Sequence, residues 1–177
     1  MKSHYSDAPT DTLPNRRTLS VLVDNEPGVL ARIAGLFSGR GYNIESLTVS
    51  ETEHEKHVSR ITIVTTGTAM VLEQIKHQLD RLVPVHRVID LTAEGSAVER
   101  ELALVKVIGK GDSRSEALRI AAAFGARTLD ATLDSFVFEL TGDSAEIERF
   151  IRVMAGLGLA EVSRTGIAAM SRGAAPL

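Results

Sequence analysis

A short segment between two hydrophobic runs holds residue types that could bind a free amino acid. It spans residues 24–30 and reads Asp-Asn-Glu-Pro-Gly-Val-Leu, directly before an amphipathic pattern. The backbone N–H groups at the start of a helix favour a carboxylate, and Gly28 has no Cβ to block its approach. The side-chain carbonyl of Asn25 could accept a hydrogen bond from an ammonium group, while Leu30 and Ile44 could supply an aliphatic wall. The segment therefore suits an amino acid with a branched apolar side chain. A plain turn that Asn25 and Gly28 only shape remains the alternative, and composition alone favours it.

The other candidate motifs are incomplete. His54–His57 has the sequence His-Glu-Lys-His, one residue short of the metalloprotease helix motif, which favours a solvated charged loop. Gly109–Ser113 resembles a phosphate-binding loop but lacks its four-residue spacer, so we expect an ordinary strand-to-helix turn, with weak anion binding left open. Asp130 and Asp134 flank a predicted turn, where Asp is common for structural reasons. No catalytic constellation stands out, and we expect no catalytic site, no bound cofactor and no metal.

Composition narrows the class of protein. The chain has 177 residues, of which 44% are hydrophobic and 24% charged, as in soluble globular proteins. A net charge of −3 argues against a partner such as nucleic acid or an anionic membrane. Cysteine is absent, which excludes disulfides and thiolate chemistry. No signal peptide or membrane span is found, and the polar residues 1–17 are expected to form a flexible arm. A cytoplasmic location fits these features.

Hydrophobic periodicity predicts a first domain over residues 18–92. Leu19, Val21 and Val23 alternate with other residues as in a strand, and apolar residues from Val29 to Phe37 recur at helical spacing. The further expected elements are strands at 42–50 and 58–65 with a charged hairpin loop at 51–56, a helix around 71–82 and a strand at 83–91. The order is β-α-β-β-α-β, which is the ferredoxin-like plan of a four-stranded antiparallel sheet with two helices on one face.

The same pattern returns after a predicted linker at 93–100. We expect a strand at 102–108, a helix capped by Ser113 and Glu116, a hairpin of strands at 127–133 and 136–141, a helix from Asp143 to Gly156, and a last strand at 159–169. The fold class is therefore α+β, with two tandem ferredoxin-like βαββαβ domains, the second over residues 101–172. Domains of this size expose sheet edges that a partner could cover.

One stretch resembles a known family closely. Residues Thr18–Ser50 are similar to the ACT domain of the small, regulatory subunit of acetolactate synthase (acetohydroxyacid synthase), and the string Gly-Tyr-Asn-Ile-Glu-Ser-Leu at 41–47 is especially characteristic. The resemblance continues through Ser59–Val64 and through Arg100–Val107, which opens the second domain. It extends from Thr18 to about Arg172 and becomes thinner after Leu133.

The resemblance implies a regulatory role and a location for the effector. Members of this family have no catalytic site; they bind a large subunit that carries thiamine diphosphate, Mg²⁺ and FAD and raise its transferase activity. They also confer feedback inhibition by valine and sometimes by related amino acids, so the preferred branched-chain amino acid stays open. Their effector site lies between the first turn of one ACT domain and the second strand of another. By motif match it would comprise Asn25, Gly28, Val29 and Leu30 of one protomer with Asn43 and Ile44 of a second copy. A homodimer or higher oligomer is therefore expected, with the second domain in contact with the large subunit.

Other functions fit the sequence less well. A ferredoxin-like RNA-binding module needs basic charge and aromatic residues on its sheet, and the chain has only five Phe and two Tyr. An amino-acid sensor acting on transcription would need a helix-turn-helix, which the pattern does not show. An ACT module that regulates a different enzyme stays open. The absence of a catalytic constellation argues against a stand-alone enzyme of amino-acid metabolism, while an active site shared with another chain stays open. The hairpin loop Glu51–His57 departs from the family pattern, so its contact with the large subunit is open too.

Overall fold

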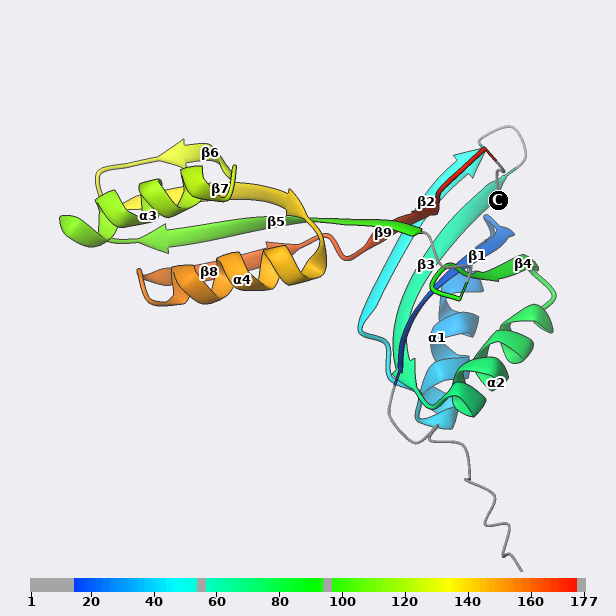
Figure 1. Ribbon diagram of the computed structural model, residues 1–177. Coiled ribbons are helices and arrows are strands. Elements are labelled where there is room, and N and C mark those ends of the chain that lie inside the picture. Colours follow the sequence, from blue (N-terminus) through cyan, green and yellow to red (C-terminus); the bar gives the residue numbers. More distant parts are fainter. Residues whose placement is uncertain (1–14, 54–56, 94–96, 175–177) are drawn as a thin grey trace, which may run out of the picture. The chain divides into compact units, whose positions relative to one another are not determined.

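The protein has two compact units, residues 1–95 and residues 96–177. The structure is a computed structural model that describes residues 15–53, 57–93 and 97–174. Each unit pairs one antiparallel sheet with two helices, and in each unit the helices lie on one face of the sheet (Figure 1). The predicted α+β class is confirmed, since both units follow the β-α-β-β-α-β order.

The first unit contains four strands and two helices. They are β1 (Asn15–Asp24), α1 (Val29–Arg40), β2 (Ser46–Glu53), β3 (Val58–Gly67), α2 (Ala69–Asp80) and β4 (Val85–Asp90). The strand order is β2-β3-β1-β4, and each neighbouring pair is antiparallel. The two central strands are therefore β3 and β1, and the loop that follows β1 lies at the start of α1.

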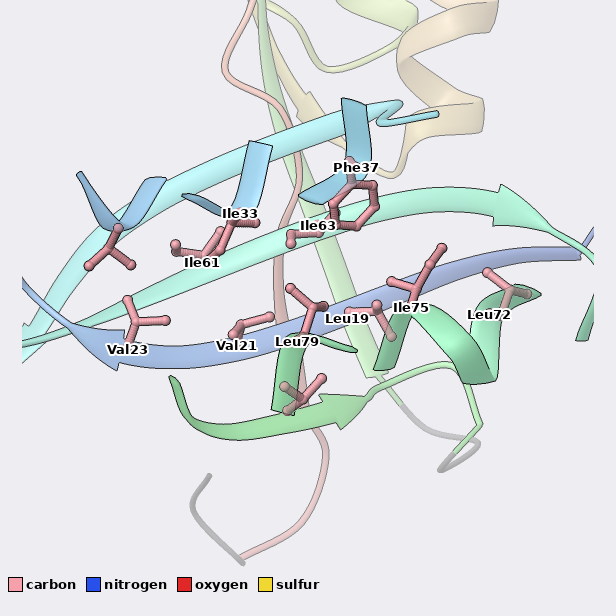
Figure 2. Close-up of a cluster of buried hydrophobic side chains, with 12 residues drawn as sticks. Leu19, Val21, Val23, Ile33, Phe37, Ile61, Ile63, Leu72, Ile75 and Leu79 are labelled. Carbon is pink, nitrogen blue, oxygen red and sulfur yellow. The ribbon is translucent and has the colours of Figure 1, made fainter. Parts of the chain in front are cut away.

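Alternating apolar residues build the core of this unit. Leu19, Val21 and Val23 of β1 are at most 1% exposed and face the helices, as their period of two predicts. Figure 2 shows Ile33 and Phe37 of α1 above β3, and Ile75 and Leu79 of α2 on the same side of the sheet. This packing fixes the rotation of α1 about its axis, which decides which residues of its first turn face outward.

The second unit repeats the topology. Its elements are β5 (Ala97–Ile108), α3 (Asp112–Ala123), β6 (Arg127–Ala131), β7 (Ser135–Gly142), α4 (Ser144–Ala155), β8 (Leu159–Arg164) and β9 (Ala168–Ser171). The order β6-β7-β5-β8 corresponds strand for strand to that of the first unit. Phe136, Phe138 and Phe150 meet in its core, where the ring centroids of Phe136 and Phe138 are 5.3 Å apart. Aromatic residues therefore fill part of this core, whereas aliphatic ones dominate the first.

Several predicted boundaries were wrong at the ends of the units. Strand β1 begins at Asn15, so Asn15–Arg17 do not belong to a flexible arm; residues 1–14 lie outside the described residues. Strand β5 begins at Ala97, within the predicted linker 93–100, because Ala97–Arg100 pair with β9. The expected last strand is two strands, β8 and β9, separated by a break in which Gly166 has φ of 82°. A pairing between residues about 70 positions apart, such as Arg100 with Ala168, leaves no local trace in the sequence.

Two local predictions were also wrong. Helix α3 is capped by Gly111, at φ 57°, without a side-chain hydrogen bond, so Ser113 and Glu116 do not form a capping box. Asp143 does cap α4, because its carboxylate accepts the N–H of Glu146 at 2.8 Å. Strand β2 begins at Ser46 rather than Tyr42, since Gly41 ends α1 in a left-handed conformation and Tyr42 donates its N–H back to Phe37.

An ion pair with a buried carboxylate connects three elements of the second unit. Arg164 of β8 donates from Nε and Nη2 to the two carboxylate oxygens of Glu101 of β5, at 2.6 and 2.7 Å. A third bond runs from Arg164 to Glu148 of α4. The Glu101 side chain is only 4% exposed, and its hydrogen bonds raise the pKa of Arg164, which keeps the guanidinium charged.

Arg164→Met is expected to lower the free energy of unfolding of the second unit by about 2–3 kcal/mol, because it leaves the buried Glu101 carboxylate unpaired. The matched control is Lys106→Met, which breaks a 2.8 Å bridge to Glu161 whose side chains are 44% and 65% exposed. We expect the loss of this exposed pair to destabilise the unit less, because solvent screens its charges. Urea denaturation of both variants measures the difference, and equal destabilisation would contradict a structural role for the Arg164–Glu101 pair.

Candidate functional site

The turn between β1 and α1 is held by hydrogen bonds to residues at the starts of β3 and β4. Asp24 donates its backbone N–H to Pro84 at 2.9 Å, and its carboxylate lies 2.6 Å from Nε2 of His86, the second residue of β4. Asn25 donates its N–H to the carbonyl of His57, the residue directly before β3, at 2.6 Å. The backbone of the turn is thus fixed, while Asn25 and Gly28 themselves are exposed.

The start of α1 is open to an anion. Gly28 is the N-cap residue, with φ 89° and ψ −7°, and it provides no side-chain cap; the first turn also carries no acidic residue. Val29 donates weakly to Glu26, at 3.4 Å, and Arg32 donates to Gly28 at 2.9 Å. These bonds leave the N–H groups of the second and third helical residues, Leu30 and Ala31, without an acceptor among the described residues. With the positive end of the helix dipole behind them, they suit a carboxylate.

Two apolar members of the predicted site face different ways. Val29 is 5% exposed and packs in the core, so only its main chain could contact a ligand. Leu30 is 44% exposed on the surface next to Gly28. The aliphatic wall on this side therefore comes from Leu30, and Val29 holds the helix against the sheet.

Asn43 and Ile44 lie in the segment between α1 and β2, where the prediction had placed a strand. The hydroxyl of Thr65 donates to the carbonyl of Asn43 at 2.6 Å, and Glu45 donates its N–H to Val64 at 2.8 Å. Asn43 is exposed, and Ile44 is partly buried against the first core. The side chain of Asn43 and part of the Ile44 side chain therefore lie at the surface, on a backbone that hydrogen bonds hold in place.

One protomer does not bring the two halves of the predicted site together. Asn25 and Gly28 lie at the amino end of α1, and Asn43 lies just beyond its carboxyl end, after the cap residue Gly41. A helix of 12 residues is about 18 Å long, several times the reach of a free amino acid. The two groups can contact one ligand only if a second copy supplies one of them.

In the part of the chain that the structure describes, the remaining sequence motifs add no second site. His54–Lys56 lie outside the described residues, and His57 contributes its backbone carbonyl rather than its ring. In the loop before α3, Lys110 pairs with Asp134 at 3.1 Å. No group of three or more His, Asp or Glu in the described ranges could hold a metal ion. Nor does any helix in those ranges combine the length and apolarity needed to cross a membrane.

Two residues that hold the site were missed by the sequence analysis. The hydroxyl of Thr65 binds Asn43, and the carbonyl of His57 binds Asn25. A threonine in a strand is ordinary, and a backbone carbonyl has no residue signature. Neither contact could be found without the tertiary structure.

The fold and the turn together define an ACT-type protein, in which a ferredoxin-like unit presents an uncapped helix start after its first strand. Residues 19–87 match the family described as acetohydroxyacid synthase (AHAS) small subunit-like ACT domain, and residues 100–173 match the small subunit of acetolactate synthase. The chain belongs to the family of acetolactate synthase small subunits.

Individual relatives match this chain over at least nine tenths of their own length. The acetolactate synthase small subunit of Mycobacterium leprae is 46% identical over 88% of this chain and 91% of its own length. The isozyme 3 small subunit of Escherichia coli is 45% identical over 89% of this chain and 96% of its own. Among solved structures, the acetolactate synthase small subunit of Thermotoga maritima superposes with a TM-score of 0.82 at 35% identity, covering 91% of this chain and 99% of that one.

Proposed function

We propose that this chain is the non-catalytic regulatory subunit of a cytoplasmic acetolactate synthase. It activates a large subunit that carries thiamine diphosphate, Mg²⁺ and FAD, and it makes that enzyme sensitive to valine. The effector binds between the first units of two protomers. The open start of α1, with the free N–H groups of Leu30 and Ala31 beside Asn25, is the observation that carries the proposal.

The chemistry of the two surface segments supports an aliphatic amino acid as the effector. The carboxylate accepts hydrogen bonds from the start of α1, where no acidic residue competes for them. The amide oxygens of Asn25 and of Asn43 from the second copy accept from the ammonium group. Leu30 and Ile44 contact the branched side chain, which fits valine better than a charged or polar effector.

The dimer follows from the separation of the two segments along α1. A two-fold axis brings the amino end of one α1 near the carboxyl end of the other and creates two equivalent sites. The second unit is left free of the effector in this arrangement. It is therefore the part that we assign to contact with the large subunit and to activation.

Reconstitution tests the proposal directly. A purified acetolactate synthase large subunit is assayed alone, with this chain, and with this chain and increasing valine, while the chain alone is assayed as a control. We expect no activity from the chain, a severalfold rise in large-subunit activity on mixing, and loss of that rise as valine increases. An unchanged large subunit, or activity of the isolated chain, would contradict the regulatory role.

A further inference from the structure

Two hydrogen bonds, one near each end of β3, hold the backbones of the two asparagines of the site. The carbonyl of His57, just before the strand, accepts the N–H of Asn25, and the hydroxyl of Thr65, near its end, donates to the carbonyl of Asn43; both distances are 2.6 Å. Each contact is made to the backbone of the asparagine, so it sets the origin and direction of the side chain. We propose that Thr65 and His57 are positioning residues for the effector, an inference that rests on the proposed function.

Thr65 is buried, and its hydroxyl makes its hydrogen bond to Asn43 inside the protein. Its side chain is 0% exposed, so its hydroxyl needs a partner inside the protein, and the carbonyl of Asn43 provides it. The neighbouring residues hold the same segment, because Val64 accepts the N–H of Glu45 and Thr66 bonds to the Glu45 carboxylate. The end of β3 thereby determines the conformation of residues 43–45, which have no ladder partner of their own.

His57 adopts a backbone conformation that side chains disfavour. Its φ is 51°, and it is the only described residue other than glycine with a positive φ. Asn, Asp and His tolerate this left-handed region best, and β-branched residues are rare outliers there. Strain of this kind persists where the surroundings require it. Here it aims the carbonyl of His57 at the N–H of Asn25.

The two contacts act on the ligand through the asparagines rather than by touching it. If the backbone of Asn25 or Asn43 moves by a fraction of an ångström, its amide no longer meets the ammonium group in the correct geometry. The hydrogen bond then weakens steeply with distance and angle. Substitutions of Thr65 and His57 are thus expected to weaken valine binding by more than a loss of fold stability alone would explain.

The test at Thr65 compares Thr65→Val, which keeps the shape but removes the donor, with Thr65→Ser, which keeps the donor. Calorimetric titration of the full-length dimer with valine is expected to show about three- to tenfold weaker binding for the valine variant, the range of one lost hydrogen bond. The serine variant should bind within about twofold of wild type. Unchanged affinity in a folded T65V dimer, or equal loss in both variants, would overturn the role of Thr65.

The test at His57 compares two variants that differ in how well they tolerate positive φ, because the contact is made by the backbone and not by the side chain. His57→Gly accepts positive φ freely, so the carbonyl should stay in place and the affinity for valine should stay within about twofold. His57→Val disfavours positive φ, and we expect about fivefold or weaker binding. Thermal unfolding measured on the same samples separates affinity from stability. Equal affinities for the two variants would overturn the role of His57.

The wild-type titration separates this inference from the proposed function. If the wild-type dimer binds no branched-chain amino acid, the proposed function fails and the positioning roles fail with it. If the wild type binds valine and all four variants bind it equally well, only the positioning roles are overturned.

Discussion

Gly28→Asp is expected to weaken inhibition by valine about a hundredfold while the holoenzyme remains activated. The aspartate places a negative charge where the effector carboxylate meets the free N–H groups of Leu30 and Ala31. Charge at a helix start is worth about 0.3–1 kcal/mol, and up to ~2 kcal/mol when partly buried. Together with the added bulk, the substitution should cost roughly 3 kcal/mol of valine binding free energy, which corresponds to the hundredfold change.

The backbone at Gly28 demands a specific control. Its φ of 89° is a conformation that most side chains avoid, although an added Cβ would meet no atom within 4 Å. Aspartate and asparagine tolerate this region better than other residues, and each costs about 1 kcal/mol of stability there. Gly28→Asn therefore shares the shape and backbone cost of G28D and differs in charge. We expect about tenfold weaker binding for G28N, so the further tenfold loss in G28D reports on the charge.

Activation and valine inhibition are measured in one assay on holoenzyme formed with each variant. Binding of the large subunit and of valine are coupled through the regulatory chain, so loss of one need not remove the other. A folded G28D variant with wild-type sensitivity to valine would remove Gly28 from the site. Loss of activation together with inhibition would instead indicate that the variant no longer assembles.

Mixed dimers of Asn25→Ala and Asn43→Ala are expected to recover one valine site that neither homodimer has. Each asparagine accepts from a charged ammonium group, so its loss should weaken binding about tenfold or more. If one site combines Asn25 of one protomer with Asn43 of the other, the mixed dimer has one site with both asparagines intact and one with neither. Titration of tagged, purified heterodimers should therefore give half the wild-type number of high-affinity sites.

The matched control carries the same two substitutions in one protomer. A heterodimer of the N25A/N43A double variant with wild type should have no intact site, because each shared site loses one asparagine. A site contained within one protomer predicts the opposite result, with one intact site in this control and none in the mixed dimer. The pair of experiments thus decides between the two arrangements without depending on the absolute affinity.

Much of the fold could be derived from local patterns. The alternation of Leu19, Val21 and Val23 and the helical spacing from Val29 to Phe37 placed β1 and α1 correctly, because each pattern reports which face of an element is buried. The turn at Asn25–Gly28 could also be singled out, since Pro and Gly restrict the backbone locally. Asn43 was connected with that turn only by resemblance to the family.

The start of β5 and the hydrogen bonds that hold the site depend on residues far away in the sequence. Ala97–Arg100 looked like a linker and is strand, because β9 pairs with it. The segment around Asn43 looked like strand and is not, because Gly41 ends the helix and Thr65 takes the Asn43 carbonyl. Local propensity cannot contain the contacts made by β9 and Thr65, since both come from partners at least 22 positions away.

The sequence by itself determined the two tandem units, their order of elements and the turn that opens α1, because these follow from hydrophobic period and turn chemistry. Only the tertiary structure decided that Val29 is buried while Leu30 is exposed, and that Gly28 has positive φ. The physical reason is that these properties depend on how α1 is rotated and anchored on the sheet. Packing of Ile33 and Phe37 and hydrogen bonds from both ends of β3 set that arrangement.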